Sequence, residues 1–268
     1  ARTRKHKREL QKKDDALRQQ IIGELVALGY GSDQERVRIA WNPYDPHGRA
    51  DFFDPATMFG PELEAGFDVV IGNPPYVQIQ KFSAAHKQAW QAQHYSTYAA
   101  TGDVYCLFYE RGVRLLKSGG QLSYITSNKW MRAGYGEKLR RFFAQDVAVQ
   151  ELIDFGGVVV FNAAMVDTAI VRLSRRAPDA SFPAAVLSRD FSLQQPLADY
   201  MQANAVPFQN PASGADSWVV MAPERYRIKQ AVEAQGIPLE QWHIQINYGI
   251  KTGYNEAFYI NDAQREAL

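Results

Sequence analysis

The sequence predicts an α/β fold, in which helices pack on a layered β-sheet. Strand-like and helix-like segments alternate from residue 67 to residue 173, and this alternation is typical of α/β proteins. The segment FDVVIG (67–72) is almost continuously apolar, which is typical of a strand buried on both faces of a parallel sheet. Both observations indicate a layered α/β sheet.

The composition is ordinary for a soluble globular protein. The 268 residues are 46% hydrophobic and 22% charged, which is enough for one large domain or two modest ones. The net charge is +1, so any basic surface that binds nucleic acid must be local. No apolar run approaches the roughly 20 residues that span a bilayer, and the charged N-terminus is unlike a signal peptide. We therefore expect a cytoplasmic protein without a membrane segment.

The sequence does not indicate metal or disulfide chemistry. Its one cysteine, Cys106, can form neither an internal disulfide nor a cysteine-based metal site. The five histidines do not recur at metal-ligand spacing. We therefore expect no metal site.

Residues 3–29 are predicted to form a helix. Apolar residues recur there at spacings of seven, four, four and three, on one helix face: Leu10, Leu17, Ile21, Leu25 and Leu28. Gly29 and Gly31 then favour a helix end. The basic residues of RTRKHKR (2–8) fit either a solvated face or an arm that contacts phosphates.

The two segments that flank FDVVIG are predicted to be irregular. Residues 41–66 carry several prolines and short turns, with RADFF (49–53) as a possible short strand. Residues 78–102 are polar without a clear period, so we expect a mobile surface loop with some helical turns.

Regular structure is predicted again from residue 103. The segment DVYCLFYERGVRLLKSGG (103–120) predicts a helix that Asp103 caps and that Gly119 and Gly120 end, a helix stop being favoured over a ligand-binding loop. The elements predicted after it are a strand at 121–127, a helix at 135–145, and strands at 151–157 and 165–176.

The character of the chain changes near residue 176. Two Pro- and Gly-containing segments, RRAPDASFPAA and FQNPASGADS, indicate linkers, with a short helix at 224–236. Residues 244–262 then predict new β-structure with tight turns. In that segment, Lys251 and Tyr254 fit a contact with DNA or a plain β-turn equally well.

The stretch GNPPY (72–76) is the strongest candidate for a functional site. Two consecutive prolines can continue neither a strand nor a helix, so the buried strand must stop there. In open α/β sheets, ligands bind beyond the carboxyl ends of the strands. Asn73 is therefore expected at a ligand-binding position, on a turn that Pro74 and Pro75 stiffen.

This arrangement suits an aromatic amine as substrate. The side-chain oxygen of Asn73 and the carbonyl of Pro74 are two fixed acceptors, and accepting both amine hydrogens favours a nitrogen with a localised lone pair. Such a nitrogen can attack an electrophilic methyl group without a separate base. The ring of Tyr76 can stack on a base, worth about 1–3 kcal/mol, which offsets part of the cost of flipping that base from a duplex.

FDVVIGNPPYV and its flanks resemble the gamma-class adenine-specific DNA methyltransferases. More narrowly, they resemble the methyltransferase–specificity part of type IIG restriction–modification enzymes. The resemblance lies in these segments: ADFFDPATMFG (50–60), DVYCLFYERGVRLLKSGGQLSYITSNKW (103–130), LIDFGGVVVFNAAMVDTAIVRL (152–173) and INYGIKTGYNEAFYI (246–260). It implies transfer of a methyl group from S-adenosylmethionine to the exocyclic amino group of a flipped adenine in double-stranded DNA.

The resemblance also implies a role for individual residues. Asn73 and Pro74 would accept hydrogen bonds from the adenine amino group, and Tyr76 would stack on the base. Phe161 matches a second aromatic residue that packs against the base, and the alternative is that it simply closes a strand end. Two further residues match positions at the methyl donor: Phe108, which also fits a helix core face, and Asp51, which also fits a turn.

Two expected parts of such an enzyme are not found. No glycine-rich turn follows a strand before residue 67, so the main donor-binding motif and the first half of the sheet are missing. No PD…(D/E)xK endonuclease array is present either. We therefore expect a fragment whose partners are the missing N-terminal and C-terminal parts of its parent chain. Alone, it should be inactive and bind S-adenosylmethionine weakly or not at all.

The predicted architecture is the latter half of a Rossmann-like methyltransferase sheet, followed by the start of a β-rich target-recognition domain. Its predicted parts are a helical insert or linker (1–40), a partial catalytic domain (41–175), a linker with a short helix (176–239) and the start of the recognition domain (240–268).

Two other functions fit the motif. NPPY also occurs in methyltransferases that modify protein glutamine, and a protein- or RNA-modifying enzyme would share it. A catalytically silent DNA-binding module would retain the same fold. The long polar segment after Tyr76 and the segment GIKTGYNEAF favour a DNA methyltransferase.

Overall fold

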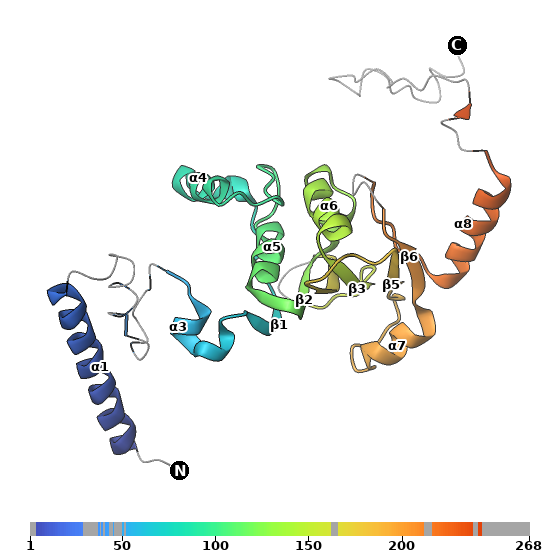
Figure 1. Ribbon diagram of the computed structural model, residues 1–268. Helices are drawn as coiled ribbons and strands as arrows, with labels where there is room; N and C mark the ends of the chain where they lie inside the picture. The colour runs from blue at the N-terminus through green and yellow to red at the C-terminus, as the bar shows by residue number, and fades with distance from the viewer. Residues whose placement is uncertain are drawn as a thin grey trace, which may run out of the picture. The chain divides into compact units, whose positions relative to one another are not determined.

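The computed structural model describes residues 4–28, 37, 39, 41–42, 45, 50, 52–161, 166–211, 216–237 and 241–242 (Figure 1). The chain divides into two compact units, residues 1–222 and 223–268. The first unit contains the sheet. In the second unit, helix α8 (Pro223–Gln235) matches the short helix predicted there.

The first unit is built on a mixed sheet, with six strands among the described residues in the order β1-β2-β4-β3-β5-β6 (Figure 1). Parallel pairs join β1 to β2 and β3 to β5, β4 lies antiparallel between β2 and β3, and β6 is antiparallel to β5. The strands are β1 (Phe67–Gly72), β2 (Leu116–Ser127), β3 (Ala148–Asp154), β4 (Thr168–Ser174), β5 (Ser181–Val186) and β6 (Val206–Gln209). Four strands therefore end at the same edge, which we call the carboxyl edge. The predicted α/β fold is confirmed.

Helices cover both faces of this sheet. Tyr109 and Phe143, from α5 and α6, share one buried cluster with Leu152 of β3. Met201 of α7 shares a second buried cluster with Ile153, the next residue of β3. Because successive strand residues point to opposite faces, the two clusters lie on opposite sides of the sheet. The helices are α5 (Tyr105–Leu115), α6 (Glu137–Gln145) and α7 (Leu197–Asn204).

Helix α1 (Arg4–Ala27) confirms the predicted N-terminal helix. Its apolar stripe is largely open to solvent, since Leu10 is 42% exposed and Leu17 is 56% exposed. The helix is therefore not part of the core of the sheet.

Strand β1 is less buried than its apolar sequence predicts. Val69 and Ile71 are 60% and 80% exposed. Val69 and Ile71 lie on one face of β1, which the described residues leave open, while Val70 on the other face packs against the core. β1 is also the end strand of the described sheet and pairs only with β2. The prediction that this strand is buried on both faces is wrong for the described residues, although its start and end are as predicted.

The helix predicted at 103–120 ends earlier than its glycines indicated. Helix α5 stops at Leu115, and β2 begins at the next residue. Gly119 has a φ of +75°, and a Cβ on Gly120 would lie 2.9 Å from the carbonyl oxygen of Phe67 in the neighbouring strand. Gly119 is therefore favoured for its backbone conformation and Gly120 for the close approach of the strands, and neither ends the helix.

The polar segment 78–102 packs more closely than a surface loop would. It forms the 3₁₀ turn η2 (Ile79–Lys81) and the helix α4 (Ala84–Ala92), which Ser83 caps. Its buried cluster contains Ile79 with Val104 and Leu107, and partly buried aromatic residues surround it: Phe82, Trp90, Tyr95 and Tyr98. These aromatic residues give the segment its own small core, which the sequence does not show because they follow no helix or strand period.

Residues 176–239 contain more regular structure than the linker that their composition indicated. Strand β5, helix α7 and strand β6 all lie there, and both strands belong to the main sheet. The boundaries of the predicted domains stay a prediction. The recognition domain predicted at 240–268 lies outside the described residues, apart from residues 241 and 242.

Candidate active site

The NPPY motif lies at the carboxyl edge, immediately after β1. Asn73 and Pro75 are exposed, Pro74 is buried and Tyr76 is partly buried. The buried Pro74 anchors the turn while the amide of Asn73 faces solvent, as a group that receives a ligand must. The backbone after the motif is fixed at Val77, whose carbonyl accepts a 2.8 Å hydrogen bond from the backbone N–H of Val104.

Tyr76 is held by the sheet and by α5. Its hydroxyl donates to the carbonyl of Ile125 in β2 over 3.3 Å, and its ring lies edge-on to Tyr105 at 6.2 Å between centroids. Burial raises the pKa of Tyr76, so its phenol stays neutral. The ring is therefore fixed at the edge of the core with part of its surface accessible.

A chain of hydrogen bonds supports this aromatic pair. The hydroxyl of Tyr105 lies 2.8 Å from that of Tyr135, and Tyr135 donates to a carboxylate oxygen of Asp103 over 2.9 Å. Burial raises the pKa of both Tyr105 and Tyr135 far above the ordinary value. Both phenols stay protonated, so Tyr105 keeps its place behind Tyr76. Asp103 was predicted to cap a helix, but its side chain accepts the last hydrogen bond of this series instead.

An apolar cavity of 360 Å³ lies beside the motif. It brings together Pro75, from the motif, and Phe108, from α5. Phe108 is 40% exposed, so its ring faces this cavity and not the helix core. The cavity is lined by Pro75, Phe82, Trp90, Tyr95, Val104, Leu107, Phe108 and Arg111. Sequence reasoning missed its aromatic walls, because they come from the polar segment 78–102.

Phe53, two residues after Asp51 in the sequence, lies near the same cavity. The guanidinium of Arg111, which lines the cavity, lies 5.5 Å from the ring centroid of Phe53. Asp51 itself lies outside the described residues, so its proposed contact with the donor stays a prediction. Asp54, three residues later, caps helix α3 (Pro55–Phe59) by accepting a 3.0 Å hydrogen bond from the backbone N–H of Thr57.

Two polar residues missed by sequence reasoning also lie at the carboxyl edge. Asn128 directly follows β2, Asp154 is the last residue of β3, and the Asn128 amide donates to the Asp154 carboxylate over 2.9 Å. The signal available in the sequence was their position at the ends of two predicted strands. Their partnership depends on the order β2-β4-β3, which the sequence did not reveal.

Phe161 lies in the connection between β3 and β4 and is partly buried. This connection starts from the carboxyl edge after Asp154, so Phe161 belongs to the same side of the sheet as Asn73. Among the described residues, no ring contact joins Phe161 to Tyr76. The two aromatic residues are therefore near the same edge without forming a closed sandwich.

The described residues contain no group of His, Cys, Asp and Glu side chains that could hold a metal ion. Within the same residues, no helix is long and apolar enough to cross a membrane.

The chain is similar to modification enzymes of restriction systems. It is 27% identical to the type II methyltransferase M.PaeR7I of Pseudomonas aeruginosa over 205 residues, which covers 73% of this chain and 36% of that protein. It is also 27% identical to the type II methyltransferase M.XhoI of Xanthomonas vasicola over 264 residues, which covers 92% of this chain and 45% of that protein. The chain thus spans less than half the length of these relatives.

A solved structure of a type I restriction–modification methyltransferase subunit from Streptococcus thermophilus aligns with a TM-score of 0.40 and 15% identity, over 64% of this chain and 32% of that one. The sequence gives the firmer assignment. The family model described as "Eco57I restriction-modification methylase" matches residues 3–161, which is more than half of the chain, and the chain therefore belongs to the Eco57I restriction–modification methylase family.

Proposed function

We propose that this chain is the catalytic part of a longer DNA methyltransferase that modifies the exocyclic amino group of adenine within a restriction–modification system. The observation that carries the proposal is the exposed amide of Asn73, held at the carboxyl edge by a buried proline. The similarity to type II methyltransferases supports DNA as the substrate.

The motif would act on the amine by orientation. The side-chain oxygen of Asn73 and the backbone carbonyl of Pro74 accept the two amine hydrogens. This localises the nitrogen lone pair and directs it toward the electrophilic methyl group of the donor. The Tyr76 ring, fixed against Tyr105, holds the base plane, and Phe161 closes from the connection between β3 and β4.

The methyl donor would occupy the apolar cavity beside the motif. S-adenosylmethionine, when bound, supplies an electrophilic methyl group and carries a flat adenine ring. The walls formed by Pro75 and Phe108 fit such a ring, since both are apolar and Phe108 presents an exposed aromatic surface. Asp51 would accept from the amino group of that ring. Further donor contacts would come from a glycine-rich turn, which the resemblance implies and which is not found in this sequence.

We expect Phe108→Ala to weaken donor binding in the full-length enzyme. Loss of aromatic stacking on a base costs about 1–3 kcal/mol, so the KM for S-adenosylmethionine should rise about tenfold with a smaller change in kcat. Leu193→Ala is a matched control, because Leu193 is 54% exposed and lies between β5 and α7. An unchanged KM in the Phe108 variant would contradict the placement of the donor.

The chemical product tests the function directly. The full-length enzyme, incubated with labelled S-adenosylmethionine and duplex DNA, should yield N6-methyladenine when the DNA is digested to nucleosides. Parallel incubations with RNA and with a protein mixture should stay unlabelled. Label in glutamine or in RNA, with none in DNA, would instead support the protein- or RNA-modifying alternative. No label in any substrate would support a silent DNA-binding module.

A further inference from the structure

A second cavity lies at the carboxyl edge, at the ends of β2 and β3. We call it the edge cavity. Its volume is 320 Å³, and it is lined by Asn128, Lys129, Met131, Arg132, Ala133, Asp154 and Asp167. None of these residues belongs to the NPPY motif or lines the apolar cavity beside it.

The floor of the edge cavity is rigid. The carboxylate of Asp154 is 3% exposed and accepts from the Asn128 amide over 2.9 Å and from the backbone N–H of Gly156 over 3.1 Å. The backbone N–H of Asn128 donates to the carbonyl of Asp167 over 3.0 Å. These bonds occupy Asp154 and tie together both ends of the connection that carries Phe161.

Two cationic side chains rise from this floor. Lys129 and Arg132 are exposed, and neither forms an ion pair with another described residue, although two aspartates line the same cavity. Their backbone is well fixed, since the N–H of Arg132 donates to the carbonyl of Lys129 over 3.1 Å, while Trp130 and Met131 between them are 0% and 1% exposed. Asp167 leaves one negative charge at the rim, so the cations outnumber the exposed acid.

The strand register relates the edge cavity to Asn73. Gly72 of β1 lies opposite Tyr124 of β2, so Asn128 is three residues further along its strand than Asn73 is along its own. With a rise of about 3.3 Å per residue and about 4.8 Å between strands, the two backbones are separated by about 11 Å. DNA carries one charge per about 3.4 Å of axis on each strand. Phosphates within about three nucleotides of a base at Asn73 can therefore reach the edge cavity.

We propose that Lys129 and Arg132 bind backbone phosphates next to the flipped nucleotide, on the DNA strand that carries it. This rests on the proposed function. A net charge of +1 gives the chain no general attraction to DNA, so affinity must come from local cations such as these. Contacts to phosphates fix the position of the nucleic acid without reading its sequence, and Arg132 can form a bidentate pair with phosphate oxygens.

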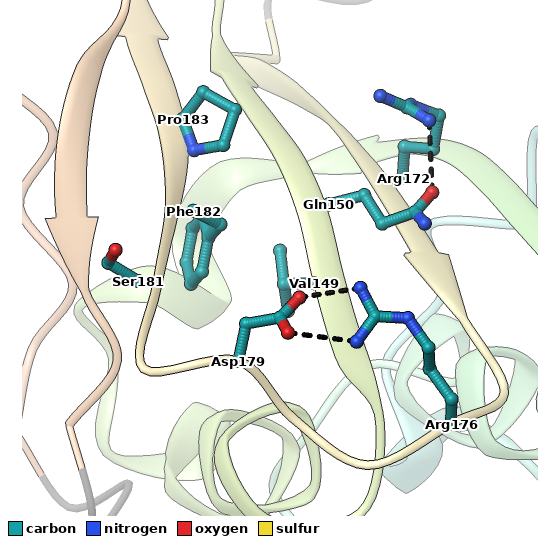
Figure 2. A pocket seen from close by; sticks show the side chains of 8 residues that line it. All are labelled: Val149, Gln150, Arg172, Arg176, Asp179, Ser181, Phe182 and Pro183. Atoms are coloured by element: carbon teal, nitrogen blue, oxygen red, sulfur yellow. Dashed lines mark hydrogen bonds and ion pairs between the residues drawn. The ribbon is translucent and has the colours of Figure 1, made fainter.

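A cavity on the opposite edge of the sheet provides a comparison (Figure 2). It also contains two cationic side chains, both of them arginines, but each is already paired. Figure 2 shows the Arg176 guanidinium facing the Asp179 carboxylate, with two hydrogen bonds of 2.9 and 2.6 Å. Arg172 donates to the side-chain oxygen of Gln150 over 2.9 Å and forms an ion pair with Glu151. This cavity lies at the starts of β3 and β5, away from Asn73.

The test uses two double variants of the full-length enzyme that remove the same charge. One is Lys129→Gln with Arg132→Gln, and the matched control is Arg172→Gln with Arg176→Gln. Affinity for a fluorescent duplex of about 30 base pairs is measured by anisotropy as the salt concentration rises from about 50 to 200 mM. At about 100 mM salt, we expect the edge-cavity variant to bind DNA at least about tenfold more weakly than wild type. The slope of log affinity against log salt concentration should become shallower by about 1.8. The control should stay within about twofold of wild type.

A charge-preserving exchange, Lys129→Arg with Arg132→Lys, separates charge from folding. It should bind nearly as wild type, and if it fails as the glutamine variant does, the phosphate site is wrong. The site is equally wrong if the glutamine variant matches the control, or if its loss is confined to one DNA sequence, which would indicate base contacts. In those cases the function stands, provided that wild type still methylates duplex DNA. A wild type that neither binds nor methylates duplex DNA overturns the function, and the phosphate site with it.

Discussion

Asn73→Ala is expected to lower kcat for DNA methylation by about 10²–10³-fold, the usual cost of removing one oriented polar group from the reacting centre. The effect should fall on the chemical step, because in the proposed mechanism the lost oxygen accepts from the amine that reacts. Asn73 is exposed and follows the last residue of β1, so its removal leaves the buried Pro74 and the fold in place. Affinities for duplex DNA and for S-adenosylmethionine should change little.

The measurement is single-turnover transfer of labelled methyl groups to duplex DNA by the full-length enzyme, with DNA affinity measured in parallel. Asn73→Asp should retain more activity than Asn73→Ala, because a carboxylate still offers an acceptor oxygen at the same place. Asn204→Ala is a control at an asparagine whose amide only donates to the carbonyl of Tyr200 within α7. Near-normal transfer by Asn73→Ala would remove the catalytic assignment.

The motif and its strand were predictable because local sterics determine them. A mostly apolar segment of six residues, followed after Asn73 by two prolines, predicts a strand that stops, and β1 ends at Gly72 as expected. The same reasoning failed on burial, because the exposure of a strand residue depends on which elements cover its face of the sheet. Val69 and Ile71 look like core residues in sequence, but β1 is the end strand of the described sheet.

The strands β5 and β6 were not predictable from composition. Each contains a proline, and proline usually indicates a loop or an edge. In the structure Pro183 lies opposite Pro207, and β5 pairs with β3 only from Ala184 onward. The two prolines therefore face each other at a position where β5 does not pair with β3. Their missing N–H groups thus leave few hydrogen bonds of the sheet unmade. That arrangement depends on tertiary pairing, which a linear pattern does not contain.

The residues of the candidate site also divide into those that the sequence predicts and those that only the structure reveals. Asn73, Tyr76 and Phe108 follow from the motif and from its resemblance to a family, and the structure brings Phe108 to the same cavity as Pro75 of the motif. The pair Asn128 and Asp154 joins strands that are separated in sequence by a helix. Only the strand order brings them together, so single-sequence reasoning had no means to pair them.

Glu110 is expected to be the main anchor of the segment that forms a wall of the apolar cavity beside the NPPY motif. Its side chain is 4% exposed, and one carboxylate oxygen accepts from Ser96 over 3.0 Å and from both the backbone N–H and the hydroxyl of Thr97 over 2.9 Å each. The other oxygen forms an ion pair with Arg114, whose guanidinium lies 4.6 Å from the ring centroid of Tyr95, a cavity wall. Glu110→Gln should therefore lower the free energy of unfolding by about 2–3 kcal/mol at pH 7, measured by urea denaturation.

The effect of Glu110→Gln should depend on pH in a defined direction. Burial alone would raise the pKa of Glu110, but hydrogen bonds from Thr97 and Ser96 outweigh it and lower the pKa below its ordinary value. A lowered pKa stabilises the folded state above the ordinary value of about 4.3, and this stabilisation is lost as pH falls through the folded-state pKa. The difference in stability between wild type and Glu110→Gln should therefore shrink between pH 7 and about pH 3.

Glu137→Gln separates this effect from the loss of any surface charge. Glu137 forms an exposed ion pair with Arg141, and such pairs contribute about 0.2–1 kcal/mol. We expect its variant to stay within that range at both pH values. If Glu110→Gln behaves like Glu137→Gln, the hydrogen bonds to Ser96 and Thr97 do not hold the cavity wall. If it destabilises at pH 7 and raises the KM for S-adenosylmethionine, then the wall and the donor site are coupled through this one carboxylate.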